Sequence, residues 1–338
     1  MNFEPWYKNP SIDKNQILSS RVRLARNLQN FPFHRKLTAT DAADIVYDVE
    51  QTTRRMRKSR LDSQQLNSLE AQIFLEKHII SPKYIKTTLP KSILTDEHQN
   101  TSVMVNEEDH IRIQSIYPGD NLALALSDAN KIDDMLEKHL DFSFDSKLGY
   151  LTTCPTNVGT GLRASFMVHL PCLDRLKLIE KLFPYITKSG LTLRGIYGEG
   201  TIPMGSIYQI SNQATLGQKE SHIIKNLAAV TGNIIRRENQ LMNKILTSRR
   251  NYLEDRAYRA YGILANCRRI GVKEAMGFLS DIRMGFFAEI LDMPRPDRHI
   301  YQIMMEIQPG HLCEYVGESM DEQETDIARA YFLREIFN

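Results

Sequence analysis

Residues Val103–Gln114 read VMVNEEDHIRIQ and decide the fold prediction. Apolar residues alternate before and after an uninterrupted polar run, NEEDH, at residues 106–110. Period-two alternation predicts two strands, with the polar run at or near a strand end or turn. The three adjacent carboxylates repel one another and need a cationic partner; without one, the run is an ordinary solvated hairpin tip. The rest of the chain must supply that partner.

The composition is that of a globular protein with room for about two domains. Of its 338 residues, 42% are apolar and 25% charged, and 43 basic against 41 acidic residues give a net charge of +2. This balance argues against bulk nucleic-acid binding, and no apolar run approaches the length of a membrane span. The cysteines have no close-paired spacing, so we expect neither a zinc site nor disulfides, and a cytoplasmic location. They are Cys154, Cys172, Cys267 and Cys313.

Both strand and helix patterns occur in the chain as far as about residue 246. We expect helices at 40–60, 66–77, 120–140, 175–187 and about 219–246, and strands at 148–153, 164–170, 191–197 and 206–213. Hairpins and long loops link the strands, which predicts an α+β fold with a largely antiparallel sheet flanked by helices. Beyond residue 247 only helices are expected, at 253–266, 272–291 and from 323. The predicted domains are a catalytic domain at 14–246 and a helical domain at 247–338.

Arginines recur at predicted strand positions or strand ends. Arg21, Arg23 and Arg26 follow two serines, and this cluster is either a basic surface strand or an anion clamp. Arg112, Arg163 and Arg194 occupy similar places in later strands. Rigidly placed guanidinium groups are what a polyphosphate needs around it.

A glycine-rich segment, CPTNVGTGLR at 154–163, directly precedes one of these strands. Gly159 and Gly161 permit close backbone approach or positive φ. The segment is no Walker A loop, because the chain contains no Gly-Lys pair, and eukaryotic-type kinase signatures have no match. With Glu107, Glu108 and Glu199 close to the arginines in sequence, the pattern favours an ATP site beside an acidic pocket that suits a cationic acceptor.

Four segments, SSRVRLARN, VNEEDHIRI, CPTNVGTGLRAS and LRGIYGEG, resemble motifs of the phosphagen kinase superfamily and occur in its order over roughly residues 17–245. The implied fold is the phosphagen kinase and glutamine synthetase-like catalytic domain. In small-guanidine kinases a helical domain precedes the SSRVR motif, whereas here the motif begins at Ser19 and an extra helical region follows the catalytic part. This layout resembles the bacterial protein arginine kinases, which phosphorylate arginine side chains in proteins.

The resemblance implies ATP and Mg²⁺, with no direct metal ligand from the protein. Glu108 would be the base, Glu107 would reach magnesium through water, Glu199 would hold the other edge of the acceptor guanidinium, and Cys154 would match the family's reactive cysteine. Arginine-directed relatives have a Glu at the position of Glu199. The implied ATP-binding residues are Ser19, Ser20, Arg21, Val22, Arg23, His78, Arg112, Arg163, Ala164, Ser165, Phe166, Met167, Arg194, Gly195, Ile196, Tyr197, Gly198 and Glu199.

The C-terminal region is expected to serve regulation, dimerisation or substrate binding. Relatives carry an RDxxRA motif that binds phosphoarginine; here it reads TDIARA, with Thr325 in place of the first arginine. Asp326, Arg329 and Ala330 could still form that allosteric site, with weaker control.

The implied partners are arginine-bearing protein substrates, a second copy in a homodimer, a zinc-binding activator, a heat-shock transcription repressor and a Clp-type protease complex. Marking proteins for stress-response regulation or proteolysis is the implied role, without membrane or direct nucleic-acid binding. The alternatives are an ATP-dependent ligase of the glutamine synthetase type, a kinase for a free small guanidino compound, and a non-catalytic adaptor that delivers clients to a protease.

Overall fold

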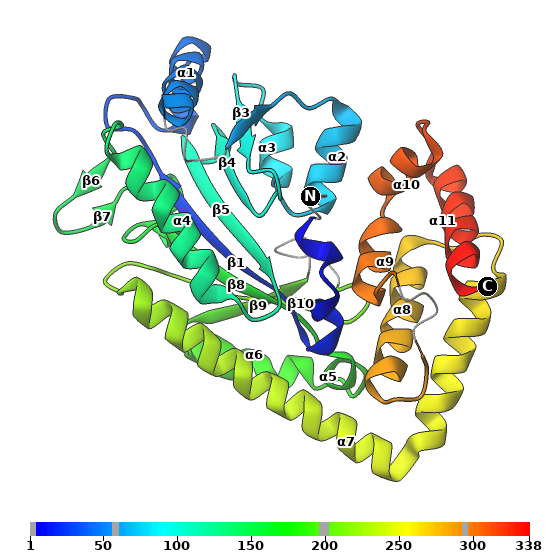
Figure 1. Ribbon diagram of the computed structural model, residues 1–338. Helices are drawn as coiled ribbons and strands as arrows, with labels where there is room; N and C mark the ends of the chain where they lie inside the picture. The colour runs from blue at the N-terminus through cyan, green and yellow to red at the C-terminus, as the bar shows by residue number, and fades with distance from the viewer. Residues whose placement is uncertain (1–4, 56–60, 196–202, 293–296) are drawn as a thin grey trace.

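An antiparallel sheet runs through the computed structural model, which describes residues 5–55, 61–195, 203–292 and 297–338 (Figure 1). Within these residues the sheet has eight strands in the order β2-β3-β4-β5-β1-β8-β10-β9, and neighbouring strands pair antiparallel. The predicted α+β class with a largely antiparallel sheet is therefore confirmed. The strands are β1 (Ile17–Arg26), β2 (Asp62–Gln64), β3 (Ser92–Thr95), β4 (Thr101–Val105), β5 (Ile111–Pro118), β8 (Leu162–His169), β9 (Leu191–Gly195) and β10 (Ile207–Asn212).

One face of this sheet is apolar because alternate residues of each strand point to the same side. Val22, Leu24, Ile113 and Phe166 on this face are almost completely buried. They pack in one core with apolar side chains that come mainly from four helices. These helices are α1 (Ala39–Arg55), α4 (Leu122–Glu137), α6 (Ile179–Lys188) and the first half of α7 (Glu220–Asn266).

The opposite face carries the polar residues, and its far end is covered by a second core. Ile116 and Met167 of the sheet pack there with Trp6, Ile12 and the C-terminal helices. Those helices form a separate group beside the sheet in Figure 1. They are α8 (Val272–Phe287), α9 (Ile300–Glu306), α10 (Pro309–Val316) and α11 (Glu322–Phe337), joined by the N-terminal turns η1 (Trp6–Lys8) and η2 (Pro10–Lys14).

Helix α7 connects the two cores and bends sharply at Arg249, whose backbone is non-helical at φ −147° and ψ 41°. Figure 1 shows its first part beneath the sheet and its second part turning toward the C-terminal helices. The bend lies three residues beyond 246, where we predicted one domain to end. The domain limits themselves stay a prediction.

The remaining elements are short. They are η3 (His34–Lys36), α2 (Ser68–Glu76), α3 (Pro82–Lys86), the hairpin β6 (Phe144–Asp145) and β7 (Gly149–Tyr150), η4 (Pro155–Asn157) and α5 (Pro171–Arg175). No helix in these described ranges is long and apolar enough to cross a membrane.

Several sequence-based boundaries differ from the structure. The strand expected at 148–153 shrinks to the two residues of β7, which pair with Phe144 and Asp145 and, through one bridge, with Gly159. The single helix expected at 175–187 is two helices, α5 and α6, separated at Lys177, whose φ is +54°. A further short helix, α3, follows α2 and was not expected; it starts at Pro82, and the Ser81 side chain caps it. Helices α9 and α10 were not expected.

Candidate active site

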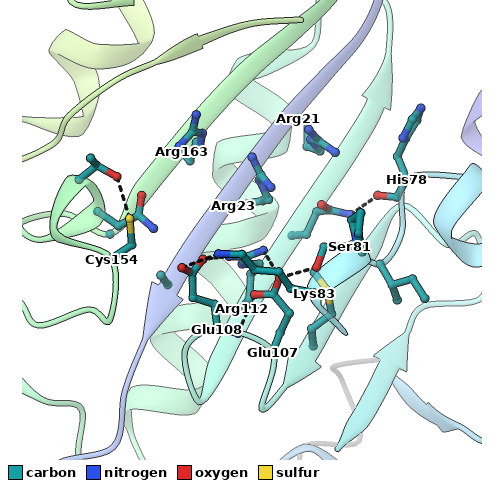
Figure 2. Close-up of a pocket in the computed structure, with 18 of the residues that line it drawn as sticks. Arg21, Arg23, His78, Ser81, Lys83, Glu107, Glu108, Arg112, Cys154 and Arg163 are labelled. Atoms are coloured by element: carbon teal, nitrogen blue, oxygen red, sulfur yellow. Dashed lines mark hydrogen bonds and ion pairs between the residues drawn. The ribbon is translucent and has the colours of Figure 1, made fainter. Parts of the chain in front are cut away.

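A cavity of about 590 Å³ opens on the polar face of the sheet. It is lined by strands β1, β5, β8, β9 and β10, by the segment from α2 to α3 and by the loop before β8. Figure 2 shows Arg21, Arg23 and Arg163 along the sheet, with Glu107 and Glu108 below them and Cys154 on the far side. Five of the predicted arginines and two of the predicted carboxylates therefore meet at one cavity: Arg21, Arg23, Arg112, Arg163, Arg194, Glu107 and Glu108.

Strand register explains why the arginines converge. Arg21 and Arg23 are two residues apart on β1 and share a face. Arg23 pairs with Arg163 of β8, while Ala25 pairs with Arg112 of β5. Arg194 on β9 pairs with Gln209 of β10, and the Arg21 side chain donates a hydrogen bond to Gln209 at 3.0 Å.

Burial, together with crowding of the cations, lowers the pKa values of two of these arginines, Arg21 and Arg23. Burial, and then the charges of Arg163 and Arg112, lower the pKa of Arg21 to about 10. Burial, and then Arg21 and its neighbours, bring the pKa of Arg23 well below its usual value. The Arg23 Nε is buried and has no hydrogen-bond partner among the described residues. An uncompensated buried guanidinium is costly, so this cavity favours an anion that neutralises it.

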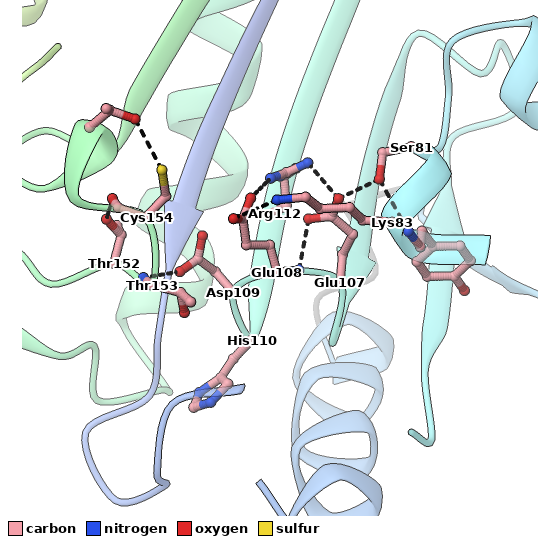
Figure 3. A network of polar contacts seen from close by, with 12 residues as sticks. Ser81, Lys83, Glu107, Glu108, Asp109, His110, Arg112, Thr152, Thr153 and Cys154 are labelled. Carbon is pink, nitrogen blue, oxygen red and sulfur yellow. Dashed lines mark hydrogen bonds and ion pairs between the residues drawn. The ribbon is translucent and has the colours of Figure 1, made fainter. Parts of the chain in front are cut away.

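The two glutamates of the polar run are held by cations at the cavity edge. Arg112 donates to Glu107 Oε1 at 2.9 Å and to Glu108 Oε2 at 3.3 Å, and the Lys83 ammonium donates to Glu108 Oε1 at 2.7 Å (Figure 3). Glu107 Oε1 also accepts from the Ser81 hydroxyl. Burial raises the pKa of Glu108, but the hydrogen bonds and charges of Lys83 and Arg112 together outweigh burial and lower it. Glu108 is therefore ionised near neutral pH.

Asp109 and His110, for which the sequence analysis predicts no role, hold the backbone around the site. Asp109 accepts from the Asn27 side chain at 2.8 Å and from the Thr153 amide at 2.6 Å, which fixes the residue before Cys154. His110 Nδ1 accepts from the Leu28 amide at 3.0 Å, and its Nε2 lies 3.0 Å from the Pro32 carbonyl. Nδ1 is thus unprotonated and Nε2 donates. Burial lowers the pKa of His110 to about 4, which keeps it neutral.

Cys154 faces the cavity from the loop before β8. Its Sγ lies 3.1 Å from the Thr156 hydroxyl, and its carbonyl accepts from Thr152 at 2.8 Å. Its side chain is neither fully buried nor fully exposed. The thiol therefore lines the same cavity as the guanidinium groups and does not lie in the apolar core.

Arg26 is not part of the cluster, because it points to the other side of the sheet from Arg23. Its guanidinium is buried against Asp133 at 2.6 Å and Tyr150, and donates to the Thr160 carbonyl at 3.0 Å. It therefore secures the glycine-rich loop, and the anion clamp suggested for this segment involves only the other two arginines. Gly161 in that loop has φ +68°, and a Cβ there would lie 2.5 Å from Arg26 Nη1.

His78 lies at the cavity with a positive φ of +59°. Burial, and then the charge of Arg21, lower its pKa to about 3, so it is neutral. The Gln114 side chain donates to the His78 and Ile79 carbonyls at 2.8 and 3.2 Å and holds this unusual backbone in place.

Among the described residues, several other predicted nucleotide ligands are not brought to the cavity. The side chains of Val22, Ala164 and Phe166 lie in the apolar core on the opposite face. The Ser20 hydroxyl donates to the Gly119 carbonyl at 2.6 Å. Ser19, Ser165 and Met167 are buried and do not line the cavity, whereas Gly195 ends β9. Ile196, Tyr197, Gly198 and Glu199 lie outside the described residues.

Sequence reasoning missed several residues that line the cavity. Gln114 and Gln209 alternate with buried apolar residues, so their strand parity could have placed them beside the arginines. Ser81 and Lys83 follow His78 closely, but only the folded path of α3 brings them to the glutamates. No group of three or more His, Cys, Asp or Glu able to hold a metal occurs among the described residues.

The altered C-terminal motif is engaged in internal contacts. The buried Arg329 donates to the carbonyls of Ile307 and Ile270, each at 2.9 Å, and to Asp326 at 2.6 Å. Ala330 is completely buried. These contacts hold α11 in place, and phosphoarginine binding there stays a prediction.

The chain matches two family models in succession. "ATP:guanido phosphotransferase, C-terminal catalytic domain" matches residues 40–241, and "Protein-arginine kinase McsB C-terminal domain" matches residues 250–338. A protein named protein-arginine kinase from Geobacillus sp. (strain WCH70) is 42% identical over 337 residues, 98% of this chain and 92% of that one. One of the same name from Bacillus subtilis (strain 168) is 40% identical over 336 residues, with the same coverage.

Two solved structures have the same fold at low identity. The duplicated taurocyamine kinase from Schistosoma mansoni with bound transition state analog components has a TM-score of 0.63 at 23% identity, over 78% of this chain and 39% of that one. This chain thus spans about two fifths of that duplicated protein. Lombricine kinase has a TM-score of 0.59 at 22% identity, over 70% of this chain and 71% of that one. The resemblance drawn from the four motifs is confirmed: the chain belongs to the ATP:guanido phosphotransferase family, among the proteins named protein-arginine kinase.

Proposed function

We propose that this chain is an ATP-dependent kinase that transfers the γ-phosphate of ATP to the guanidinium of arginine side chains in proteins. The observation that carries this proposal is a single cavity with arginines along one side and the Glu107–Glu108 pair at its edge. A polyphosphate suits the first group and a cationic acceptor suits the second. Relatives named protein-arginine kinase align along almost the whole chain, which supports a protein acceptor.

On the ATP side, Arg21, Arg23, Arg163 and Arg194 bind the phosphates. They stand on paired strands and need no rearrangement as charge develops in the loose transition state of phosphoryl transfer. The orphan Nε of Arg23 fits an anionic ligand. Losing one such preorganised donor typically costs about 3 kcal/mol of transition-state stabilisation. Arg112 already binds both glutamates, and it connects the two halves of the site.

On the acceptor side, Glu108 orients the guanidinium and takes its proton. The acceptor has a pKa above about 12 and no free lone pair, so a carboxylate cannot deprotonate it in advance. The bond from the γ-phosphorus to the bridging oxygen therefore breaks as the P–N bond forms, and the proton moves to Glu108 late in this step. ADP leaves with the electron pair of the broken bond. Glu199 would hold the other edge of the guanidinium, and Cys154 would lie beside it.

Mg²⁺ would neutralise charge on the phosphates and arrive with ATP. Magnesium is usually held by one or two carboxylates together with substrate phosphates, and Glu107 is the carboxylate suited to hold one of its waters. Glu107 Oε2 already accepts the Glu108 amide at 2.7 Å, which fixes the carboxylate plane.

The wider role is proposed on the family resemblance. It comprises stress-response regulation or Clp-type proteolysis, a zinc-binding activator, a heat-shock repressor, a homodimer and a cytoplasmic location. The residues at 14–246 would form the catalytic domain and those at 247–338 the helical one. Asp326, Arg329 and Ala330 would bind phosphoarginine, with weaker control because Thr325 replaces an arginine.

The test is to incubate the protein with magnesium and ATP, once with an arginine-containing protein and once with free arginine. Acid-labile phosphate on arginine residues of the protein is expected. Label on free arginine alone would assign a small-guanidine kinase instead, and no label on either would favour a non-catalytic adaptor.

A further inference from the structure

Lys83 already occupies the carboxylate that the acceptor needs. It is the second residue of α3, and its ammonium lies 2.7 Å from Glu108 Oε1 (Figure 3). Helix α3 is fixed at its start because the Ser81 hydroxyl both caps the helix and donates to Glu107. The Lys83 ammonium is therefore tethered beside the site.

Both oxygens of Glu108 carry a cation in this arrangement. Arg112 binds Oε2 at 3.3 Å and is also bonded to Glu107, and only 10% of its side chain is exposed. The Lys83 side chain is 62% exposed and has this one ion pair among the described residues. A guanidinium that grips a carboxylate with two parallel hydrogen bonds needs a free Oε1. Lys83 is the cation that can leave.

We propose that Lys83 is a specificity-determining residue for the acceptor: its ammonium competes for Glu108 Oε1, so that a guanidinium displaces it and a lysine side chain of a protein does not. The inference rests on the proposed function, because it takes Glu108 as the acceptor carboxylate. Beyond that function, it assigns Lys83 as a competitor of the acceptor for Glu108 and explains why amines are rejected.

The physical basis is the difference between the two cations. A guanidinium is planar, weakly hydrated and able to form two parallel bonds to one carboxylate, whereas an ammonium is a compact, strongly hydrated point charge. A lysine from a substrate would offer Glu108 the same single contact that Lys83 already makes. The tethered group has the advantage of high effective concentration, so it excludes a second ammonium.

The test compares Lys83→Met with the parent enzyme, using a peptide with one arginine as acceptor and a lysine-only peptide as inhibitor. Methionine keeps much of the length and removes the charge. The KM for the arginine peptide should fall about two- to five-fold, as expected for loss of one exposed ion pair. The inhibition constant of the lysine peptide should fall at least as much. Lys86→Met, on the same helix and exposed, should change neither value.

Unchanged or raised constants in Lys83→Met would overturn the inference. Equilibrium binding of the arginine peptide, measured in the Glu108→Gln background, provides a second check: Lys83→Met should have no effect there, because the contested carboxylate is gone. If the parent enzyme labels no arginine, the proposed function fails. Peptide affinity, measured in the parent and in Lys83→Met, then still decides whether Lys83 competes for Glu108.

Discussion

Glu108 is the residue on which the proposed chemistry depends most. Its replacement by Gln keeps the shape and one hydrogen-bond acceptor but cannot take the proton of the acceptor. We expect kcat to fall by a factor of about 10² to 10⁴, the usual contribution of a positioned general base. ATP affinity, measured by equilibrium titration, should stay nearly unchanged because the phosphate-binding arginines are untouched. Glu97→Gln, an exposed position off the cavity, is the matched control; equal loss of ATP binding and turnover in Glu108→Gln would contradict the assignment.

His110 makes stability depend on pH. Its pKa is lowered from 6.5 to about 4 in the folded protein, mainly by burial, so between these pH values the unfolded chain binds one more proton than the native state. The contribution of His110 to the free energy of unfolding is at its full value above pH 6.5, and it is lost as the pH falls toward 4. At pH 5 the loss is about 2 kcal/mol.

Urea unfolding at pH 7 and pH 5 measures this effect. The drop in unfolding free energy between the two pH values should be about 2 kcal/mol smaller in His110→Asn than in the parent. His139→Asn, at an exposed histidine, should leave the drop unchanged. His78, with a pKa near 3, should keep part of the acid sensitivity in both variants. An identical drop in the parent and in His110→Asn would contradict the role assigned to the neutral ring.

At the scale of elements, the loop before β8 depends on Gly161. Gly161 has a positive φ, and a Cβ at this position would also meet Arg26 Nη1 at 2.5 Å and the Ala25 carbonyl at 2.6 Å. Gly161→Ala should therefore combine backbone strain of roughly 1–2 kcal/mol with overpacking of about 1–3 kcal/mol. Because the same loop carries Cys154, kcat should fall as well.

Gly190→Ala separates the two causes. Its φ of +70° is similar, but a Cβ at that position would meet nothing within 4 Å. Denaturant unfolding should show only the strain of roughly 1–2 kcal/mol for this variant, and activity should be retained. If the two alanine variants lose the same stability, the close approach of Arg26 does not matter.

Strand alternation predicted much of the site. Alternation puts residues two apart on one side of a strand, as it does Arg21 and Arg23 on β1, and it separated the polar run from the flanking strands. It could not give the register that sets Arg23 opposite Arg163, because register depends on partners far away in the chain. The contact of Lys83 with Glu108 was hidden for a similar reason, since it depends on how α3 folds back. The strand predicted at 148–153 was longer than β7, because an apolar segment extends a sheet only where a partner strand of the same length runs beside it.

At the scale of the whole molecule, the N-terminal segment and the C-terminal helices form one unit against the catalytic sheet. Arg283 of α8, fully buried, donates to Asp13 at 2.9 Å and to the Ile12 carbonyl at 2.9 Å, and it also contacts His169 of β8. A linear sequence gives no sign that residues near 12 and 283 meet. Burial of such a charge is stable only with its partners in place, so this cluster fixes how the two cores sit together.

A second buried contact links the C-terminal helices to α2, the helix that leads into the cavity. Glu76, at the end of α2 and two residues before His78, accepts from the amides of Gly310 and His311 at 2.8 and 3.1 Å and from the His311 ring at 2.8 Å. Its exposed fraction is 2%. The start of α10 is therefore bonded to the helix that leads to His78, which lines the cavity.

Glu76→Gln should loosen this contact, because a neutral amide replaces a carboxylate that accepts several bonds in a buried setting. We expect a loss of about 3 kcal/mol in unfolding free energy and faster amide hydrogen exchange at Gly310 and His311. Since α2 leads into His78, the KM for ATP should rise while the acceptor KM stays unchanged. Glu318→Gln, exposed just beyond α10, is the control that should alter none of these. If hydrogen exchange rises at α10 but the KM for ATP does not, the contact joins the two cores without reaching the nucleotide.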